Sequence, residues 1–245
     1  MKETRFFFDP DLNGKLPEDE AKHAVRVLRL TEGDIINLMD GRGTFCEAEI
    51  TSAGNHRCLY RITLREMQEP AWTGHLHLAM APTKLNDRIE WFAEKATEIG
   101  FNELSFLRCR FSERKELKTE RVDKIVVSAT KQSHKAWKPV VNGMEDFKTF
   151  IQAERPGLKF ICHCYEDADV CDTEPRPFLL DALRQGEDAT VLIGPEGDFS
   201  VEEVKLAKEH GYRSVSLGRS RLRTETAALV AVHLMQIKNQ LTLKC

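Results

Sequence analysis

The chain has 245 residues, of which 41% are hydrophobic and 31% charged, and its formal net charge is −3. This composition excludes an intrinsically disordered chain and a strongly basic protein that coats nucleic acid. No stretch approaches the roughly 18 apolar residues of a membrane span, and we expect neither a signal peptide nor a membrane partner. The cysteines number 7 and show no disulfide framework, which favours a reducing, cytoplasmic location.

The first third of the chain is predicted to be a small unit made mostly of β-strands. Segments of alternating or β-branched residues, separated by glycine-containing turns, indicate closely spaced antiparallel strands that form a small barrel. We expect these strands at Asp34–Met39, Thr44–Thr51 and Arg57–Leu64, preceded by a short strand at Phe6–Phe8 and a helix after Pro17. The segment Glu69-Pro70-Ala71 is the best candidate for a linker.

After this linker, strands alternate with long helices, which predicts a mainly parallel sheet covered by helices. The expected strands are His75–Met80, Leu104–Leu107, Lys159–Cys164, Ala189–Ile193 and Ser214–Leu217. The expected helices are Asp87–Gly100, Thr119–Lys135, Ser200–Gly211 with a capping box, and Glu225–Asn239. We therefore predict two domains, residues 1–70 and 71–245, of which the second has an α/β fold.

The charge is distributed unevenly along the chain. Residues 108–138 carry ten Lys or Arg against four Asp or Glu, whereas residues 164–188 carry two Arg against eight acids. Four further arginines are Arg213, Arg219, Arg221 and Arg223. A net charge of −3 therefore hides a local basic surface, and local fields govern binding more than the total does.

A glycine-containing loop is predicted between a buried strand and a capped helix. It consists of Ile193-Gly194-Pro195-Glu196-Gly197-Asp198-Phe199-Ser200. Ligands of open α/β sheets bind at the carboxyl ends of strands, and glycines let the backbone approach a ligand closely. A tight turn with no ligand would account for the same composition equally well. The pattern is neither a Walker A motif nor a dinucleotide fingerprint, which argues against a nucleoside triphosphatase and a dehydrogenase.

A second loop of the same kind joins the last strand to the last helix. It runs from Leu217-Gly218 through Arg219, Arg221 and Arg223 to Thr224, which we expect to cap the helix. Taken alone, such a loop is more often a solvated basic turn than a site. Two loops of this type at consecutive strand ends favour a binding site.

Together these motifs resemble the cofactor-binding signature of the SPOUT methyltransferases, and more narrowly the RsmE family of 16S rRNA uridine-N3 methyltransferases. The resemblance rests on Gly194-Pro195-Glu196-Gly197 with Phe199-Ser200, and on Leu217-Gly218 with Leu222-Arg223-Thr224-Glu225-Thr226-Ala227. Further similar segments are Arg5-Phe6-Phe7, His23–Leu30, Asp40–Gly43, Lys84–Arg88, Lys95–Gly100, Ser112–Arg114 and Lys131–Ser133. In two places the chain departs from the family pattern. Asp198 stands where a second glycine is expected, and Lys135 where an arginine is expected.

The resemblance implies a PUA-like β-barrel domain, followed by a SPOUT-type parallel sheet with a C-terminal deep trefoil knot. It implies that S-adenosylmethionine binds in that knot, held by three loops, of which Cys164-Tyr165-Glu166 is the first. The implied cofactor-binding residues are Leu192, Ile193, Gly194, Pro195, Glu196, Gly197, Leu217, Gly218, Leu222, Arg223, Thr224, Thr226 and Ala227. Members act as homodimers, and the final helix, with Leu229, Val232 and Leu234, suits that interface.

Methylation of a uridine N3 also requires that its weakly acidic imide lose a proton. Arg223 is the candidate to stabilise the developing negative charge, and Glu196 or Glu225 is the candidate base. Glu225 in the first helical turn is equally explained by its favourable interaction with the helix dipole. The sequence does not choose between these carboxylates.

Basic side chains are predicted to grip 16S rRNA on the small ribosomal subunit. Lys22, Arg26 and Arg29 are spaced to share one face of the first helix, and Lys131 and Lys135 one face of a later helix. The complete predicted RNA-binding set is Arg5, Lys22, Arg26, Arg29, Lys84, Arg88, Arg114, Lys131, Gln132 and Lys135. For any single lysine of this set, ordinary solvation is the simpler explanation, so the prediction concerns the set.

The sequence is also compatible with two other functions: a catalytically silent RNA-binding or ribosome-assembly factor of the same fold, and a methyltransferase for a different RNA. Cys162-His163-Cys164 with Cys171 hints at a metal site, but no second ligand pair has zinc spacing. We therefore expect no metal.

Overall fold

The computed structural model describes residues 6–54, 57–165 and 176–241, and the chain divides into two compact units. Unit 1 comprises Met1–Ala71 with Val127–Lys138, and unit 2 comprises Trp72–Val126 with Pro139–Cys245. The segment Val127–Lys138, which the sequence places in the second domain, thus clusters with the first unit. Among the described residues, no helix combines the length and apolar character needed to cross a membrane.

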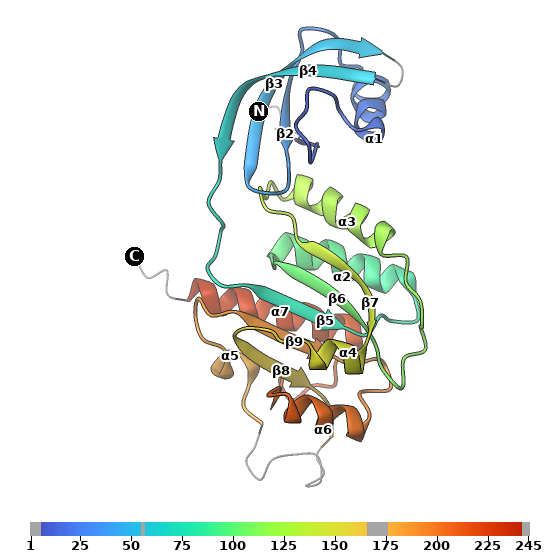
Figure 1. Cartoon of the computed structure of the whole chain (residues 1–245), viewed down its shortest axis with the longest axis vertical. Helices are drawn as coiled ribbons and strands as arrows, with labels where there is room; N and C mark the ends of the chain where they lie inside the picture. The colour runs from blue at the N-terminus through green and yellow to red at the C-terminus, as the bar shows by residue number, and fades with distance from the viewer. Residues whose placement is uncertain (1–5, 55–56, 166–175, 242–245) are drawn as a thin grey trace. The chain divides into compact units, whose positions relative to one another are not determined.

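Unit 1 is built on a curled four-stranded sheet in the order β1-β2-β3-β4 (Figure 1). Its strands are β1 Phe6–Phe8, β2 Ile35–Met39, β3 Thr44–Gly54 and β4 Arg57–Met67. The pair β1–β2 is parallel, whereas β2–β3 and β3–β4 are antiparallel. An antiparallel bridge between Lys15 and Leu59 adds the segment after β1 to the free edge of β4. Because β1 and Lys15 are close in sequence, this pairing curls the sheet toward the predicted barrel.

The first helix is shorter and less regular than predicted. Helix α1, Glu18–Lys22, continues into a π-helical turn, His23–Val27, and Leu28 ends it. Arg29 lies beyond the helix with a left-handed φ of 55°. The prediction that Lys22, Arg26 and Arg29 share one helical face is therefore wrong, because a π-helical turn changes the residue spacing and Arg29 is not helical.

Unit 2 contains a six-stranded sheet in the order β10-β8-β9-β5-β6-β7, and all its strand pairs are parallel (Figure 1). The strands are β5 Leu76–Met80, β6 Glu103–Arg108, β7 Val140–Asp146, β8 Leu158–Cys162, β9 Ala189–Ile193 and β10 Arg213–Val215. Every residue of the central strands β5 and β9 is buried. Their continuous apolar runs are typical of strands covered on both faces.

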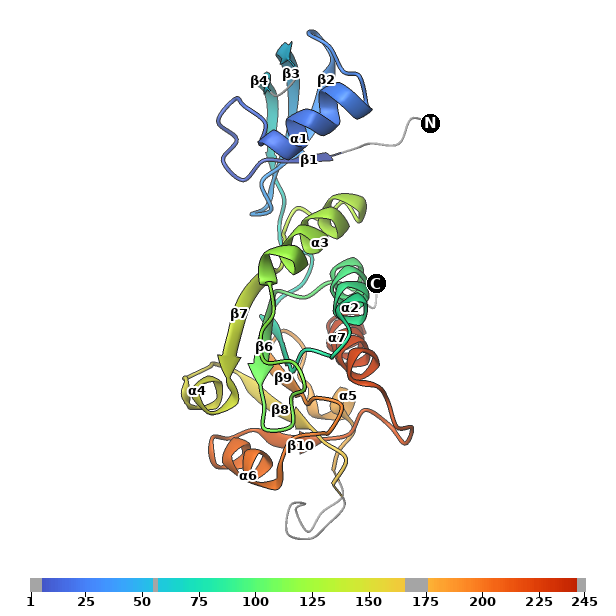
Figure 2. The same cartoon turned by 90° about the vertical axis from the view of Figure 1, so that its right-hand side faces the viewer.

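Helices cover both faces of this sheet (Figure 2). On one face, α7 (Thr224–Gln240) packs against α2 (Asn86–Ile99), α5 (Leu179–Ala182) and the strands β5 and β9. On the other face, α4 (Phe147–Gln152) packs against α6 (Val201–Glu209). Each face has its own cluster of buried apolar side chains. This arrangement confirms the predicted α/β fold with a parallel sheet.

Several elements differ from the sequence prediction. Strand β7 and helices α4 and α5 were not predicted, and α3 (Thr119–Gln132) ends before Lys135. Lys131 and Lys135 therefore do not share a helical face. Val232 and Leu234, predicted to pack across a dimer interface, are buried in the core of their own unit, while Leu229 is partly buried against the same core.

Candidate active site

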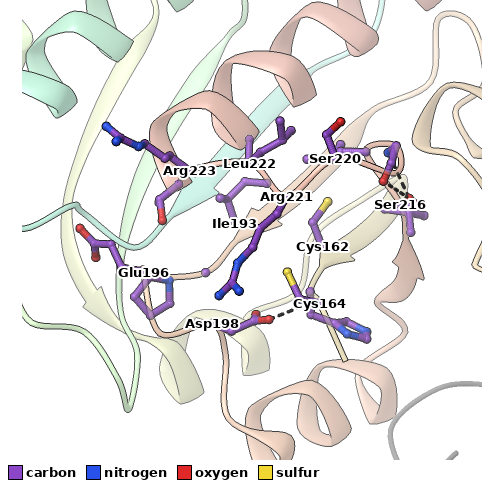
Figure 3. Close-up of a pocket in the computed structure, with 18 of the residues that line it drawn as sticks. Cys162, Cys164, Ile193, Glu196, Asp198, Ser216, Ser220, Arg221, Leu222 and Arg223 are labelled. Atoms are coloured by element: carbon purple, nitrogen blue, oxygen red, sulfur yellow. Dashed lines mark hydrogen bonds between the residues drawn. The ribbon is translucent and has the colours of Figure 1, made fainter. Parts of the chain in front are cut away.

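Three loops meet at the carboxyl edge of the parallel sheet of unit 2. They follow β8, β9 and β10, which are neighbours in the strand order, so their carboxyl ends lie together. The loops enclose a cavity of about 720 Å³, lined by Cys162–Cys164, Ile193–Asp198 and Val215–Thr224 (Figure 3). This volume is within the usual range for a site that binds one small organic molecule.

The loop after β9 is a tight turn that requires glycine. The N–H of Asp198 donates to the carbonyl of Pro195 at 2.9 Å, which closes the turn. A Cβ at Gly194 would lie 3.0 Å from the ring of Phe199, and one at Gly197 would lie 3.1 Å from Phe111. Larger residues at these two positions would therefore push the turn away from its packing partners.

Asp198 itself has a left-handed φ of 66°. Aspartate is among the non-glycine residues that accept this conformation most readily. Its carboxylate accepts from the N–H of Cys164 at 2.7 Å, and from the N–H of Phe199 at 2.7 Å. A second bond, from the Tyr165 hydroxyl to the Phe199 carbonyl at 2.7 Å, runs between the same two loops. The β8 and β9 loops are thus fastened to each other.

Helix α6 begins directly after this turn. The Ser200 hydroxyl accepts from the N–H of Glu203, whose carboxylate accepts from the N–H of Ser200. This reciprocal pair confirms the predicted capping box and fixes where the loop ends.

The loop after β10 carries the arginines. Gly218 has a φ of 119°, and a Cβ there would meet no atom within 4 Å, so open space adjoins the backbone. The loop ends at Arg223, which is the N-cap residue of α7 and makes no side-chain cap. Thr224 is the first helical residue, so the prediction that it caps α7 is wrong. In Figure 3, Arg221 extends toward Asp198, whereas Arg223 extends away from it.

Most of the predicted cofactor-binding residues line this one cavity. They are Ile193, Gly194, Pro195, Glu196, Gly197, Leu217, Gly218, Leu222, Arg223, Thr224 and Ala227. Leu192 and Thr226 do not line it; Leu192 is fully buried in the core on the α4–α6 face. Cys164 of the predicted first loop lines the cavity, Tyr165 does not, and Glu166 is outside the described residues.

The two candidate bases have different surroundings. Glu196 is exposed on the cavity wall, and its carboxylate accepts from the N–H of Lys84 at 2.9 Å. Glu225 is buried, only 7% exposed, and does not line the cavity. One of its oxygens lies 3.6 Å from the Arg88 Nε, and the other has no hydrogen-bond partner among the described residues.

Three predicted RNA-binding residues gather beside the Glu196 side of the cavity. The Arg114 guanidinium donates to the carbonyls of Thr83 and Lys84, which holds the turn before α2 in place. The Lys84 ammonium pairs with Glu113 at 2.7 Å, and Arg88 lines the cavity. The structure thus brings Lys84, Arg88 and Arg114 to the site.

The other predicted RNA-binding residues belong to unit 1. Lys22 pairs with Glu18 at 2.7 Å and Lys131 with Glu20 at 2.6 Å, so both ammonium groups already have a carboxylate partner. Arg26, Arg29 and Gln132 are exposed, Lys135 is half-buried, and Arg5 is outside the described residues.

Several cavity residues were not predicted to bind a ligand, notably Cys162, His163 and Arg176, whereas Arg219 and Arg221 lie in the second predicted loop. Burial raises the pKa of the Cys162 thiol to about 12, and burial together with Asp198 raises that of Cys164. Both thiols are therefore protonated at neutral pH and are poor nucleophiles. Cys162 is the last residue of β8 and Cys164 follows it, so their place at the carboxyl end of a strand next to β9 was the available signal. Within the described ranges, no three His, Cys, Asp or Glu side chains are grouped to hold a metal ion.

Comparison of the chain with known proteins shows the family to which it belongs. A model of the RNA methyltransferase domain matches residues 70–236, and a model of the RNA methyltransferase PUA domain matches residues 16–63. Ribosomal RNA small subunit methyltransferase E of Rickettsia conorii is 28% identical, over 95% of this chain and 94% of the relative. The chain belongs to the RsmE family of RNA methyltransferases. The Bacillus subtilis member is 27% identical, over 91% of this chain and 89% of its own.

Solved structures agree with membership of the RsmE family. A probable rRNA-methyltransferase from Porphyromonas gingivalis is 41% identical with a TM-score of 0.85, and the match covers 95% of this chain and 98% of that one. RsmE from Neisseria gonorrhoeae, solved with bound S-adenosylmethionine, is 25% identical with a TM-score of 0.81, over 96% of this chain and 97% of that one. The first unit of this chain is therefore PUA-like, and the second is the methyltransferase domain of the family.

Proposed function

We propose that this protein transfers a methyl group from S-adenosylmethionine to N3 of one uridine in 16S rRNA. Membership of the RsmE family supports the reaction class, and the observation that carries it for this chain is the cavity formed by the three loops after β8, β9 and β10. The proposed substrate places the reaction in the cytoplasm.

The cavity suits S-adenosylmethionine in size and chemistry. It offers backbone groups from loops that contain Gly194, Gly197 and Gly218, where a ligand approaches without meeting a Cβ. Such N–H and C=O groups would hydrogen-bond the adenine edge and the amino-acid end of S-adenosylmethionine. When bound, the cofactor supplies a methyl group that is electrophilic because it is attached to a sulfonium. The protein then has to position the uridine nitrogen and remove its proton.

We assign charge stabilisation to Arg223 and proton acceptance to Glu196. Arg223 is exposed at the end of the β10 loop, where its guanidinium can hydrogen-bond an oxygen of the uracil imide as negative charge develops. Glu196 lines the cavity, whereas Glu225 does not. The N–H of Lys84 fixes the direction of the Glu196 carboxylate, which leaves its second oxygen for the imide proton.

Glu225 is assigned a different role, the orientation of Arg88. The two side chains come from the first turns of α7 and α2, and their charged atoms are 3.6 Å apart. A buried carboxylate next to a guanidinium at the cavity wall holds that guanidinium toward the substrate. We propose that Arg88, with Lys84 and Arg114, contacts phosphates beside the target uridine.

The two predicted domains are assigned different roles. We propose that residues 1–70 form the RNA-binding PUA-like domain and residues 71–245 the methyltransferase domain. We further propose that the β10 loop and α7 complete a deep trefoil knot and that two copies of the chain form a homodimer. Support for the knot comes from the three loops that meet at the carboxyl ends of the neighbouring strands β10, β8 and β9, and from membership of the RsmE family.

Methyl transfer in vitro tests the proposed function. The protein is incubated with methyl-labelled S-adenosylmethionine and with either small ribosomal subunits or free 16S rRNA from cells that lack it. We expect label in 16S rRNA, released by nuclease digestion as N3-methyluridine and identified by mass spectrometry. Label in a different nucleoside would assign another target. Binding of RNA without any transfer would instead identify a catalytically silent assembly factor.

A further inference from the structure

Asp198 is the cavity residue that departs from the family pattern, in which a glycine is expected at this position. It occupies a left-handed position where glycine is expected, and it brings a carboxylate to the cavity wall (Figure 3). A glycine would form the same turn without a side chain. The backbone geometry therefore does not require the carboxylate, and its effect must come from what it contacts and from its charge.

The charges around the cavity are unequal. Among the described residues that line it, the cations are Arg88, Arg176, Arg219, Arg221 and Arg223, and the acids are Glu196 and Asp198. The Glu196 carboxylate is turned to the N–H of Lys84. Asp198 is thus the acid on the side of Cys164 and Arg221, and it partly offsets an excess of positive charge.

The field of Asp198 reaches other groups at the wall. The pKa of the Cys164 thiol is raised by burial and by the Asp198 charge, while Arg221 and Arg176 act in the opposite direction. Opposed charges therefore act on the same part of the cavity. A ligand placed there experiences both.

The two cofactor forms that a methyltransferase binds differ by one charge. S-adenosylmethionine carries a sulfonium cation, whereas its product, S-adenosylhomocysteine, has a neutral thioether and the same other groups. An excess of arginines disfavours the sulfonium, so such a cavity would retain the product. One added carboxylate on the wall favours the cationic form.

We propose that Asp198 is a specificity-determining residue whose negative charge favours S-adenosylmethionine over S-adenosylhomocysteine. This inference rests on the proposed function, because it takes the cavity to be the cofactor site. The hydrogen bonds of Asp198 to Cys164 and Phe199 hold its carboxylate in place at the wall. The role is electrostatic, and it adds to the fastening of the two loops.

The test separates charge from loop anchoring. Asp198→Asn keeps a side-chain oxygen for the Cys164 N–H and tolerates the left-handed backbone, but it removes the charge and the hydrogen bond from the Phe199 N–H. Dissociation constants for S-adenosylmethionine and S-adenosylhomocysteine are measured by titration calorimetry. We expect affinity for S-adenosylmethionine to fall about ten-fold, the effect of one unit charge at about 10 Å in a medium of intermediate dielectric. Affinity for S-adenosylhomocysteine should change less than about two-fold.

Two further variants complete the design. Asp198→Gly keeps the backbone conformation and removes both the charge and the loop-to-loop bond, so it should show the same loss of preference. Glu202→Gln removes a charge from the exposed face of α6, away from the cavity lining, and should leave the preference unchanged. Equal losses for both ligands in Asp198→Asn, or no change for either, would overturn the inference. A wild-type protein that binds neither ligand would instead overturn the proposed function itself.

Discussion

At the scale of single residues, Arg223 is the residue to which we assign stabilisation of the charge that develops during methyl transfer. It ends the β10 loop, lines the cavity and immediately precedes α7, so its backbone is fixed while its side chain is exposed. Among the described residues, its guanidinium has no carboxylate partner. A cation with these properties is available for an oxygen that gains negative charge.

Substitution of Arg223 should therefore affect the reaction and leave the fold unchanged. We expect Arg223→Ala to lower the rate of methyl transfer by about 100-fold or more, because one preorganised donor to a developing charge is removed. The free energy of unfolding should change by less than about 0.5 kcal/mol, since the side chain is exposed. Rates come from label transfer to 16S rRNA, and stability comes from urea unfolding.

Arg213→Ala provides the matched control for Arg223→Ala. Arg213 is an exposed arginine at the start of β10, and it does not line the cavity. Its replacement should leave the methyl-transfer rate within about two-fold of the wild type. A near-normal rate in Arg223→Ala would remove Arg223 from the active site.

Single residues also show which features of the site could be predicted from the sequence and which could not. The glycines of Gly194-Pro195-Glu196-Gly197 were sufficient to predict the β9 loop, because the packing of Phe199 and Phe111 leaves little room for a Cβ at Gly194 and Gly197. The positions of Glu196 and Glu225 were not predictable. One faces the cavity and the other is buried, and this depends on how α2, α7 and the β9 loop pack. Thr224 had the residue type of an N-cap, but the structure begins the helix one residue earlier.

At the scale of elements, a partly buried polar network joins β5, β6 and β7 of the parallel sheet. His75 Nε2 lies 2.7 Å from a Glu103 oxygen, and His77 Nε2 lies 2.9 Å from the Ser105 hydroxyl. The Asn142 amide donates to both Glu103 and Ser105. His77 is 4% exposed, and its burial lowers its pKa to about 4.

This network makes the stability of unit 2 dependent on pH. Between about pH 6.5 and pH 4 the unfolded chain binds a proton at His77 that the folded chain excludes, so stability falls as the pH falls. The slope from this group is up to about 1.4 kcal/mol per pH unit. The hydrogen bond with His75 lowers the pKa of Glu103 to about 2, so its contribution is present above about pH 4.5 and is lost below it.

His75 acts in the opposite direction from His77. Its pKa is raised by the hydrogen bond with Glu103, so its contribution is complete below about pH 6.5 and is lost as the pH rises above that value. Between pH 6.5 and pH 4 the decline therefore comes mainly from His77. We expect His77→Gln to flatten the decline in urea unfolding over this range, whereas His233→Gln, at an exposed position in α7, should retain it. An equally steep decline in His77→Gln would contradict this assignment.

The central strands of the parallel sheet were predictable from their continuous apolar runs, whereas the edge strand β7 was not. All residues of β5 and β9 are buried, so their sequences are strongly apolar. Strand β7 lies at the edge of the sheet, where its residues are exposed or half-buried, and its sequence gives no strand pattern. No residue pattern in the sequence indicates the π-helical turn at His23–Val27. The sequence therefore predicted a regular helix and placed Arg29 on the wrong face.

At the scale of the whole molecule, the chain combines a net charge of −3 with basic groups around one cavity. Such a charge distribution favours one structured RNA over indiscriminate binding of nucleic acid. Sequence alone predicted the α/β fold of unit 2. The assignment of Val127–Lys138 to unit 1 was not predictable, because it depends on contacts between segments distant in the chain.

The central claim, that this protein methylates N3 of one 16S rRNA uridine, is tested most directly in cells. Nucleoside mass spectrometry of 16S rRNA is compared between cells with and without the protein. We predict that one N3-methyluridine is lost when the protein is absent, is restored by the wild-type chain, and is not restored by Arg223→Ala. An N3-methyluridine content that is the same with and without the protein would contradict the claim.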